Sequence, residues 1–256
     1  MTNILDIGRR GLGKSTLAGY QAKQLNRNQI YFDPGEQFHN VDRIFSAVEE
    51  FQEELEGWPD EESFAFAFVP PRGDVEGHWN RFAAMLWGFI GSFAGAASFV
   101  LIVDESHRLQ SPSYINDWLD EFIRRAPRRE RDDSNPIDLI QTTHYPQDLN
   151  RVSWGESDYI YFFNIFDKRA LKAIDEQFSE KIPNIAYTVG DNPALVPNLA
   201  TPKTGGRELL EVQSETGEYR IITNPEEWSN DIRKSKPAKD AIEATERELE
   251  ETYGKY

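Results

Sequence analysis

Short runs of apolar residues alternate with amphipathic segments along the first 180 residues of the chain. The apolar runs predict strands at Ile4–Ile7, Gln29–Phe32, Ser63–Val69, Phe99–Val103, Ile137–Thr142 and Tyr159–Ile165. Apolar residues at helical spacing predict helices at Thr16–Asn26, Val41–Leu55, Trp79–Ile90, Tyr114–Arg125 and Lys168–Phe178. Strands that alternate with helices indicate an α/β fold, a three-layer sandwich in which helices cover both faces of a mostly parallel sheet.

Residues 82 to 103 carry no charged side chain, and this run is long enough to suggest a membrane span. Three glycines interrupt it, at Gly88, Gly91 and Gly95, and two carboxylates follow it directly. A buried helix followed by a buried strand accounts for the run better than a single membrane helix does. We therefore expect no membrane span.

The character of the chain changes after residue 180. Residues 184 to 206 are rich in Pro, Asn and Gly, and two apolar stretches, Glu208–Val212 and Glu218–Ile222, then flank the turn Ser214–Gly217. This pattern predicts a β-hairpin. The domain organisation we expect is a core at 1–180, an extension with the hairpin at 181–229, and a charged tail, helical or disordered, at 230–256.

The segment from Gly8 to Thr16 has the pattern G-x-x-x-x-G-K-S of a phosphate-binding P-loop, between a predicted strand and a predicted helix. Its glycines let backbone N–H groups turn inward towards phosphate oxygens, and the helix N-terminus adds a positive dipole end. We expect ATP and Mg²⁺ as ligands, with Lys14 on the β- and γ-phosphates and Ser15 on the metal. The candidate nucleotide-binding residues are Gly8, Arg9, Arg10, Gly11, Leu12, Gly13, Lys14, Ser15 and Thr16. Arg9 and Arg10 lie either beside the phosphates or in solvent.

Two carboxylates, Asp104 and Glu105, follow the apolar run at Phe99–Val103 and form a Walker B pattern. Such a strand places Asp104 beside the P-loop, where it holds the magnesium shell. Glu105 is the candidate base that polarises water for attack on the γ-phosphate. Because kinases of the P-loop class often lack the second carboxylate, the pair favours NTP hydrolysis coupled to motion. The predicted fold is thus a P-loop NTPase sandwich with a C-terminal hairpin and a charged helical tail.

Further polar residues are candidates for the same site. Gln141 ends the next predicted strand and is our candidate sensor of the γ-phosphate, whereas His144 is either a second polar group or a plain loop histidine. Asp6 is unusual in a buried strand, so it pairs with a P-loop group or an arginine, or else the strand is only partly buried. The densest basic stretch is a solvated helix end, a source of an arginine finger for a neighbouring subunit, or a DNA path. It contains Arg124, Arg125, Arg128, Arg129 and Arg131.

Composition limits the partners and the setting. The net charge of −16 and a pI of about 4.7 argue against a protein that coats nucleic acid by bulk charge, and leave a local basic track open. The chain has no cysteine, which excludes disulfides and fits a reducing setting. The N-terminus runs straight into the first predicted strand, so no signal peptide is expected. The family resemblance described next implies the cytoplasm of a host cell, or a virion, as the setting.

Together these motifs resemble the FtsK/HerA superfamily of P-loop ATPases. The resemblance rests on Gly8–Thr16, on Val100–His107 with its Asp-Glu-x-His end, on the arginine-bearing helix, and on Ile140–Leu149 with its strand-end glutamine and short Pro-containing stretch. It covers residues 1 to 178, and the small size is similar to genome-packaging ATPases of tailless, membrane-containing icosahedral viruses and to Zot-like ATPases of filamentous phages. It implies a homo-oligomer, often a hexameric ring, with sites between subunits and double-stranded DNA in the pore.

The function that we expect from these residues is ATP-driven DNA translocation, in particular packaging of a viral genome, with capsid or portal proteins as further partners. A protein-assembly ATPase that does not move DNA is the first alternative. A non-motor enzyme such as a nucleotide kinase is the second, and a terminase motor without its nuclease is the third. DNA-stimulated ATPase activity separates the first reading from the others.

Overall fold

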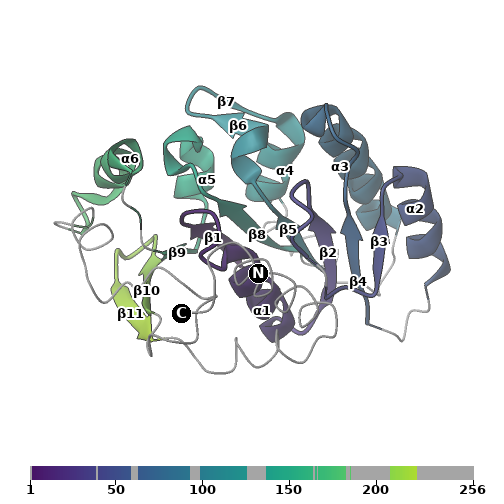
Figure 1. Cartoon of the computed structure of the whole chain (residues 1–256), viewed down its shortest axis with the longest axis horizontal. Coiled ribbons are helices and arrows are strands. Elements are labelled where there is room, and N and C mark those ends of the chain that lie inside the picture. Colours follow the sequence, from purple (N-terminus) through teal and green to yellow (C-terminus); the bar gives the residue numbers. More distant parts are fainter. Residues whose placement is uncertain are drawn as a thin grey trace, which may run out of the picture.

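The computed structural model describes residues 2–38, 40–58, 63–92, 99–125, 137–163, 165, 167–182, 185 and 208–223. Its centre is a nine-stranded sheet in the order β11-β10-β9-β1-β8-β5-β2-β4-β3 (Figure 1). The strands are β1 Asn3–Ile7, β2 Asn28–Phe32, β3 Arg43–Phe45, β4 Ala65–Phe68, β5 Phe99–Val103, β8 Ile137–Thr143, β9 Tyr159–Phe162, β10 Glu208–Gln213 and β11 Tyr219–Thr223. All pairings from β9 to β3 are parallel, as predicted, and β10 and β11 pair in the antiparallel sense.

The helices cover the two faces unequally. They are α1 Lys14–Gln24, α2 Val48–Gly57, α3 Val75–Ser92, α4 Asp117–Arg125, α5 Arg151–Gly155 and α6 Lys168–Phe178, with short 3₁₀ turns η1 Ser106–Leu109 and η3 Pro146–Asp148. Figure 1 shows α1 on one side of the sheet and α2, α3, α4 and α5 on the other. A small hairpin, β6 Gln110–Ser111 and β7 Tyr114–Ile115, joins η1 to α4. The structure is therefore the predicted α/β sandwich.

The alternation of side chains along each strand decides which residues meet which layer. On β5, Val100 and Ile102 pack with α1, whereas Leu101 and Val103 pack with the aromatic residues of α3 and α4. The alternating Phe and Ala residues of β4 follow the same rule: Phe66 and Phe68 enter the larger core, and Phe68 stacks on Phe82 with ring centroids 4.8 Å apart. Ala65 and Ala67 lie on the opposite face, so β4 contributes less side-chain volume to the layer between the sheet and α1.

The prediction of one helix over Val41–Leu55 was wrong in its first half. Residues 43 to 45 form β3, which pairs with β4, and α2 begins only at Val48. Hydrogen bonds hold this edge: Asp42 N–H donates to the carbonyl of Ala65 at 2.8 Å, and the Asp42 carboxylate accepts from Ala65 N–H at 2.8 Å. Helical spacing therefore described the packing of Phe45 and Phe51 correctly but not the backbone that presents them.

The predicted helix Tyr114–Arg125 is also shorter than expected. Tyr114 and Ile115 belong to β7, and α4 begins at Asp117. The cause is Asn116, whose side-chain oxygen accepts a hydrogen bond from Trp118 N–H at 3.1 Å and so caps the helix. The same oxygen accepts from the indole N–H of Trp79 at 2.9 Å, which ties the start of α4 to α3.

The uncharged run at residues 82 to 103 divides as predicted, with α3 ending at Ser92 and β5 beginning at Phe99. Among the described residues, no helix combines the length and the apolar character that a bilayer crossing requires.

The predicted C-terminal hairpin is present and extends the core sheet. β10 pairs with β9, so that Leu210 and Val212 join the cluster formed by Phe162 and the apolar face of α6. The predicted boundary at residue 181 therefore separates segments that share one sheet, and it stays a prediction. The charged tail at 230–256 lies outside the described residues.

Candidate nucleotide-binding and hydrolysis site

The P-loop connects β1 to α1 and curls around the side chain of Lys14. Gly11 and Gly13 have φ angles of 79° and 90°, a left-handed conformation that other residues seldom adopt. Lys14 Nζ donates a hydrogen bond to the carbonyl of Arg9 at 3.0 Å, and Leu17 N–H donates to the carbonyl of Gly13 at 2.9 Å. The loop thus presents the first turn of α1, with its free N–H groups, next to a lysine ammonium. This is the arrangement that binds phosphate.

Gly8 is held between two neighbouring strands. Its N–H donates to the carbonyl of Thr143 at the end of β8, at 3.1 Å. A Cβ atom at this position would lie 2.5 Å from the Cβ of Phe163. The first glycine of the motif is therefore needed for close approach of β9, in addition to any role with nucleotide.

Gly8→Ala is expected to lower the free energy of unfolding and to weaken nucleotide binding together, because the added Cβ must displace the P-loop or Phe163. Overpacking of this kind costs about 1–3 kcal/mol. Denaturant unfolding and titration with an ATP analogue measure the two effects. Gly19→Ala, on α1 where an added Cβ meets no atom within 4 Å, is the matched control. Unchanged stability of Gly8→Ala would contradict the close approach.

The other P-loop residues divide by exposure. Leu12 is buried against Leu17, Phe163 and Leu209, so the tip of the loop rests on the C-terminal hairpin. Arg9 and Arg10 are exposed. The hairpin, which the sequence analysis assigned to an extension, thus packs against the P-loop through Leu209.

Lys14 carries a buried ammonium group, with 8% of the residue exposed. Burial lowers its pKa to about 8, and the nearby carboxylates of Asp104, Asp6 and Glu105 oppose that shift. The lysine therefore stays mostly protonated at pH 7 although little of it reaches solvent. A bound phosphate would add negative charge beside it.

Asp6 lies fully buried in β1 below the loop. Its Oδ1 accepts a hydrogen bond from Gln21 Nε2 on α1 at 3.2 Å, while burial raises its pKa well above the ordinary value. Of the readings left open by the sequence, a partly buried strand and an arginine partner are wrong. Asp6 pairs with Gln21 on α1 instead.

Asp104 follows β5 and faces the P-loop side of the sheet. Thr142 Oγ1 on β8 donates to Asp104 Oδ1 at 2.5 Å, and only 3% of the residue is exposed. Burial raises the pKa of Asp104 to about 6, with the neighbouring Asp33 and Glu105 carboxylates adding to the rise and the Thr142 hydrogen bond and Lys14 opposing it. Asp104 is thus ionised at pH 7 and would gain from a cation.

The residues present fit a magnesium ion. Mg²⁺ prefers oxygen ligands and takes few of them from protein when phosphates are available. Asp104 Oδ2 lies next to Gly35, where an added Cβ would come within 3.2 Å of that oxygen, so the glycine leaves space around it. Ser15, on the first turn of α1, is partly exposed and supplies a hydroxyl. Asp104 and Ser15 are the residues that would hold the ion.

Glu105 has a backbone conformation that is rare for a residue with a side chain, with φ 50° and ψ 42°. Its N–H donates to Thr142 Oγ1 at 3.4 Å, and its carboxylate forms an ion pair with Arg108 at 3.2 Å. The side chain stays 24% exposed. Strained backbone of this kind is often found at functional positions, where the fold holds one side chain in place. Here the left-handed backbone at Glu105 makes the side chains of Asp104 and Glu105 point in different directions.

The structure does not bring Gln141 to the predicted position. Its amide oxygen accepts from Ser153 Oγ at 3.2 Å and from Gln110 Nε2 at 3.4 Å, and the residue is 1% exposed. Because side chains alternate along β8, Gln141 faces away from Asp104 and Thr142 faces towards it. Thr142 is therefore the residue of this strand that contacts the Walker B carboxylate.

The described arginines of α4 lie at the other edge of the sheet. The carbonyl of Ile123 accepts from Asn3 Nδ2 at 3.0 Å, and Asn3 is the first residue of β1, whereas the P-loop follows its last residue. Arg124 is exposed and pairs with Asp120 at 2.6 Å. Arg124 thus lies at the opposite end of β1 from the P-loop of its own chain. Arg128, Arg129 and Arg131 lie outside the described residues.

Known family models and curated proteins contain no match to this sequence. Solved structures do match. The genome packaging NTPase B204 from Sulfolobus turreted icosahedral virus 2, in complex with AMPPCP, shares 16% identity and a TM-score of 0.62, over 88% of this chain and 97% of that chain. B204 from Sulfolobus Turreted Icosahedral Virus shares 18% identity and a TM-score of 0.55 over the same fractions, 88% and 97%. VirB4 of Thermoanaerobacter pseudethanolicus shares 11% identity and a TM-score of 0.52, over 87% and 89%.

This chain has the P-loop NTPase fold that these structures share. At these identities the likeness concerns the fold, and the site must be judged from its own residues.

Sequence reasoning missed three residues that surround the candidate site. Thr142 contacts Asp104, Arg108 pairs with Glu105, and His107 packs on His144 with ring centroids 4.5 Å apart. Thr142 ends a predicted strand, and His107 and Arg108 follow one within a few positions. The sequence signal was therefore present, since polar residues at the carboxyl ends of adjacent parallel strands converge, but it did not rank them.

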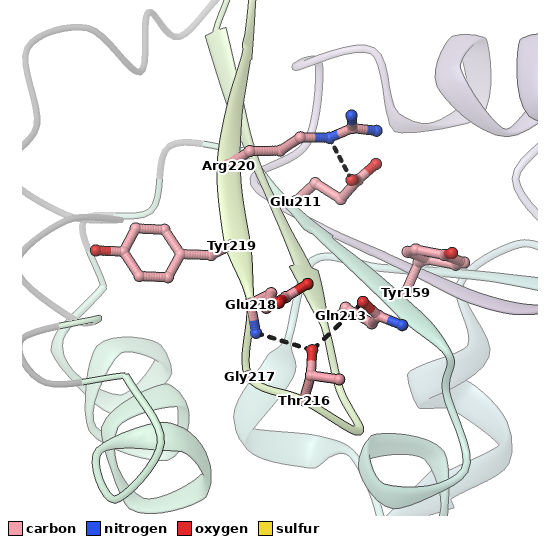
Figure 2. A pocket seen from close by; sticks show the side chains of 8 residues that line it. All are labelled: Tyr159, Glu211, Gln213, Thr216, Gly217, Glu218, Tyr219 and Arg220. Atoms are coloured by element: carbon pink, nitrogen blue, oxygen red, sulfur yellow. Dashed lines mark hydrogen bonds and ion pairs between the residues drawn. The ribbon is translucent and has the colours of Figure 1, made fainter.

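An open pocket of about 620 Å³ lies on the C-terminal hairpin, away from the P-loop (Figure 2). It is lined by Tyr159, Glu211, Gln213, Thr216, Gly217, Glu218, Tyr219 and Arg220. Figure 2 shows the ion pair of Arg220 and Glu211 on the strands and Tyr159 and Tyr219 on opposite sides of them. Because Tyr159 begins β9 and the P-loop lies near its end, this pocket and the phosphate site are separate.

Proposed function

We propose that this chain is an ATP-hydrolysing motor that moves double-stranded DNA, with packaging of a viral genome as its task. The observation that supports hydrolysis is the convergence of Lys14, Asp104 and Glu105 at the carboxyl edge of the sheet, where each influences the charge of another. The fold neighbours that are packaging NTPases support the choice of DNA as the partner.

In this proposal each residue has a separate task. The P-loop N–H groups and Lys14 bind the β- and γ-phosphates, and Ser15 and Asp104 hold the metal. Magnesium, when bound, neutralises charge on the phosphate oxygens. Glu105 accepts a proton from the attacking water, while its backbone conformation and Arg108 restrict where the carboxylate lies. Thr142 holds Asp104 in place from β8.

The remaining charge comes from a neighbouring subunit in a ring. Arg124 lies at the opposite edge of the sheet from its own P-loop, which supports a role in trans, and Arg125 is its neighbour in α4. An arginine that reaches the γ-phosphate from a neighbour stabilises the transition-state charge. Assembly would therefore be required for full activity.

A protein-assembly ATPase that does not translocate DNA is the second candidate. The net charge of −16 favours it, because an acidic surface repels the DNA backbone except along a local basic track.

The test combines oligomeric state and turnover. We expect light scattering to detect particles larger than the 29.5 kDa monomer when an ATP analogue and double-stranded DNA are present, and ATPase activity to increase with added DNA. Activity without DNA binding or stimulation would favour the protein-assembly reading. A monomer under every condition would contradict the ring.

The trans arginine has its own test within that experiment. The double variant Arg124→Ala/Arg125→Ala should lose turnover, and so should Glu105→Gln. Mixing the two should restore part of the activity, since each supplies what the other lacks. If the arginine variant alone turns over at the wild-type rate, neither residue is the finger.

A further inference from the structure

His144 occupies the position next to the P-loop where β8 ends. The preceding residue, Thr143, accepts the Gly8 N–H through its carbonyl at 3.1 Å, so the backbone at 143 is bonded to the first glycine of the loop. His144 therefore lies at the carboxyl edge of the sheet, next to β1, the strand that leads into the P-loop.

Two aromatic rings pack against this histidine. Ring centroids of His144 lie 4.5 Å from His107 and 4.1 Å from Tyr145, and His107 lies 4.9 Å from Tyr145. His107 is further fixed by Thr143, whose Oγ1 lies 3.3 Å from His107 Nδ1. Among the described residues, the half-buried His144 makes no side-chain hydrogen bond, so its ring nitrogens are more available than those of His107.

The groups that face His144 are mainly cationic. Lys14 and Arg10 act on it from the P-loop, Arg108 from η1, and Glu105 supplies the one opposing negative charge. Burial and these cations lower the pKa of His144, so the ring is neutral at pH 7 in the nucleotide-free protein. His107 is shifted further, to a pKa of about 3, first by burial and then by His144, Arg108 and Lys14.

We propose that His144 takes up a proton when a nucleoside triphosphate binds and then contacts the γ-phosphate as an imidazolium. This deepens the proposed function and rests on it. The γ-phosphate brings negative charge into the space that Lys14, Arg10 and Arg108 surround, and it therefore reverses the field that keeps the ring neutral. The proton comes from solvent, and no covalent bond forms or breaks. His107 stays neutral because it is packed more deeply.

The sign of the pH dependence follows from linkage. Because the bound complex holds the proton more tightly than the free protein, the affinity that His144 contributes is fully present below the free-state pKa. It is lost as pH rises through the bound-state pKa. A diphosphate lacks the γ-phosphate and should not show this contribution, so His144 would distinguish triphosphate from diphosphate.

Titration calorimetry of the full chain tests this inference. A non-hydrolysable ATP analogue with Mg²⁺ is titrated at pH 7 in two buffers of different ionisation enthalpy, which measures the protons taken up. We expect wild type to take up more protons than His144→Gln, by an amount approaching one per site. From pH 6 to pH 8, wild-type affinity should weaken by up to about tenfold more than the affinity of the variant. The difference between proteins cancels protons exchanged by the ligand itself.

The controls separate this inference from the function on which it rests. His78→Gln changes a partly exposed histidine on α3 that pairs with Arg81, and it should behave as wild type. ADP should bind all three proteins equally, which also checks that His144→Gln folds. Equal proton uptake by wild type and His144→Gln would overturn the inference and leave the ATPase proposal intact. Absence of nucleotide binding by every protein would overturn both.

A second measurement needs no loss of the side chain. Imidazole resonances of the wild-type chain, which has four histidines, are followed by pH titration with and without the ATP analogue. One resonance, assigned by its absence in His144→Gln, should titrate at higher pH when the analogue is bound. An unchanged titration would equally overturn the inference.

Discussion

Glu105→Gln is expected to bind ATP with nearly wild-type affinity and to hydrolyse it at least about 100-fold more slowly. The amide keeps the size of the side chain and can still accept a hydrogen bond from Arg108, but it cannot accept a proton from water. The Glu105 side chain is 24% exposed and lies one residue after a buried carboxylate, so a water molecule can reach it. Steady-state phosphate release and analogue titration measure the two quantities.

Glu53→Gln, an exposed position on α2, is the matched control and should leave turnover unchanged. If Glu105→Gln hydrolysed ATP at the wild-type rate, another group would be the base and the assignment of Glu105 would be wrong. A parallel loss of affinity and turnover would indicate instead that the ion pair of Glu105 and Arg108 shapes the binding site.

Lys14→Met should weaken binding of an ATP analogue by about 100-fold or more, because two charge-assisted hydrogen bonds to phosphate contribute about 1.5–3 kcal/mol each. The same change should leave the free energy of unfolding unchanged or raise it. Methionine fills similar space without a buried charge, and burial has already lowered the pKa of Lys14 to about 8. The residue would then be retained for function at a cost in stability.

The pH dependence of that cost has a defined sign. The folded-state pKa of Lys14, about 8, lies below the ordinary lysine value of 10.5, so the unfolded chain binds more protons between these values. Wild-type stability attributable to Lys14 therefore rises with pH across this window, and the advantage of Lys14→Met shrinks. Below pH 8 the stability advantage of Lys14→Met over wild type is at most about 3 kcal/mol, since each pKa unit corresponds to about 1.4 kcal/mol.

Denaturant unfolding at pH 7 and pH 9.5 measures this dependence, with Lys23→Met as the control on the exposed side of the same helix. A Lys14→Met protein that is less stable than wild type at both pH values would show that the ammonium group stabilises the empty loop, through its bond to the Arg9 carbonyl, more than burial penalises it.

The errors of the sequence analysis have a common physical origin. Hydrophobic spacing over Val41–Leu55 located Phe45 and Phe51 in the core, but Phe45 reaches it from an edge strand and Phe51 from a helix, and Ile44 is exposed. Whether a short segment pairs with a neighbouring strand depends on hydrogen bonds to residues far along the chain, here Ala65. Local pattern cannot contain that information.

The candidate site shows the same division. Asp104 and Glu105 could be predicted because two acids directly after a buried strand have few structural explanations. Gln141 and Thr142 are adjacent, and either could have faced the phosphates. Only the pairing of β8 with β5 decided that Thr142 contacts Asp104 and that Gln141 bonds to Ser153.

By itself the sequence determined the P-loop, the Walker B carboxylates and the parallel α/β sheet, because each depends on local chemistry: glycine freedom, charge after an apolar run, and periodicity. The tertiary structure decided what depends on distant contacts. It bonded Gly8 to the end of β8, set Leu12 on the C-terminal hairpin, and placed Arg124 at the opposite edge of the sheet. It also brought His107 and His144, separated along the chain, together beside the loop.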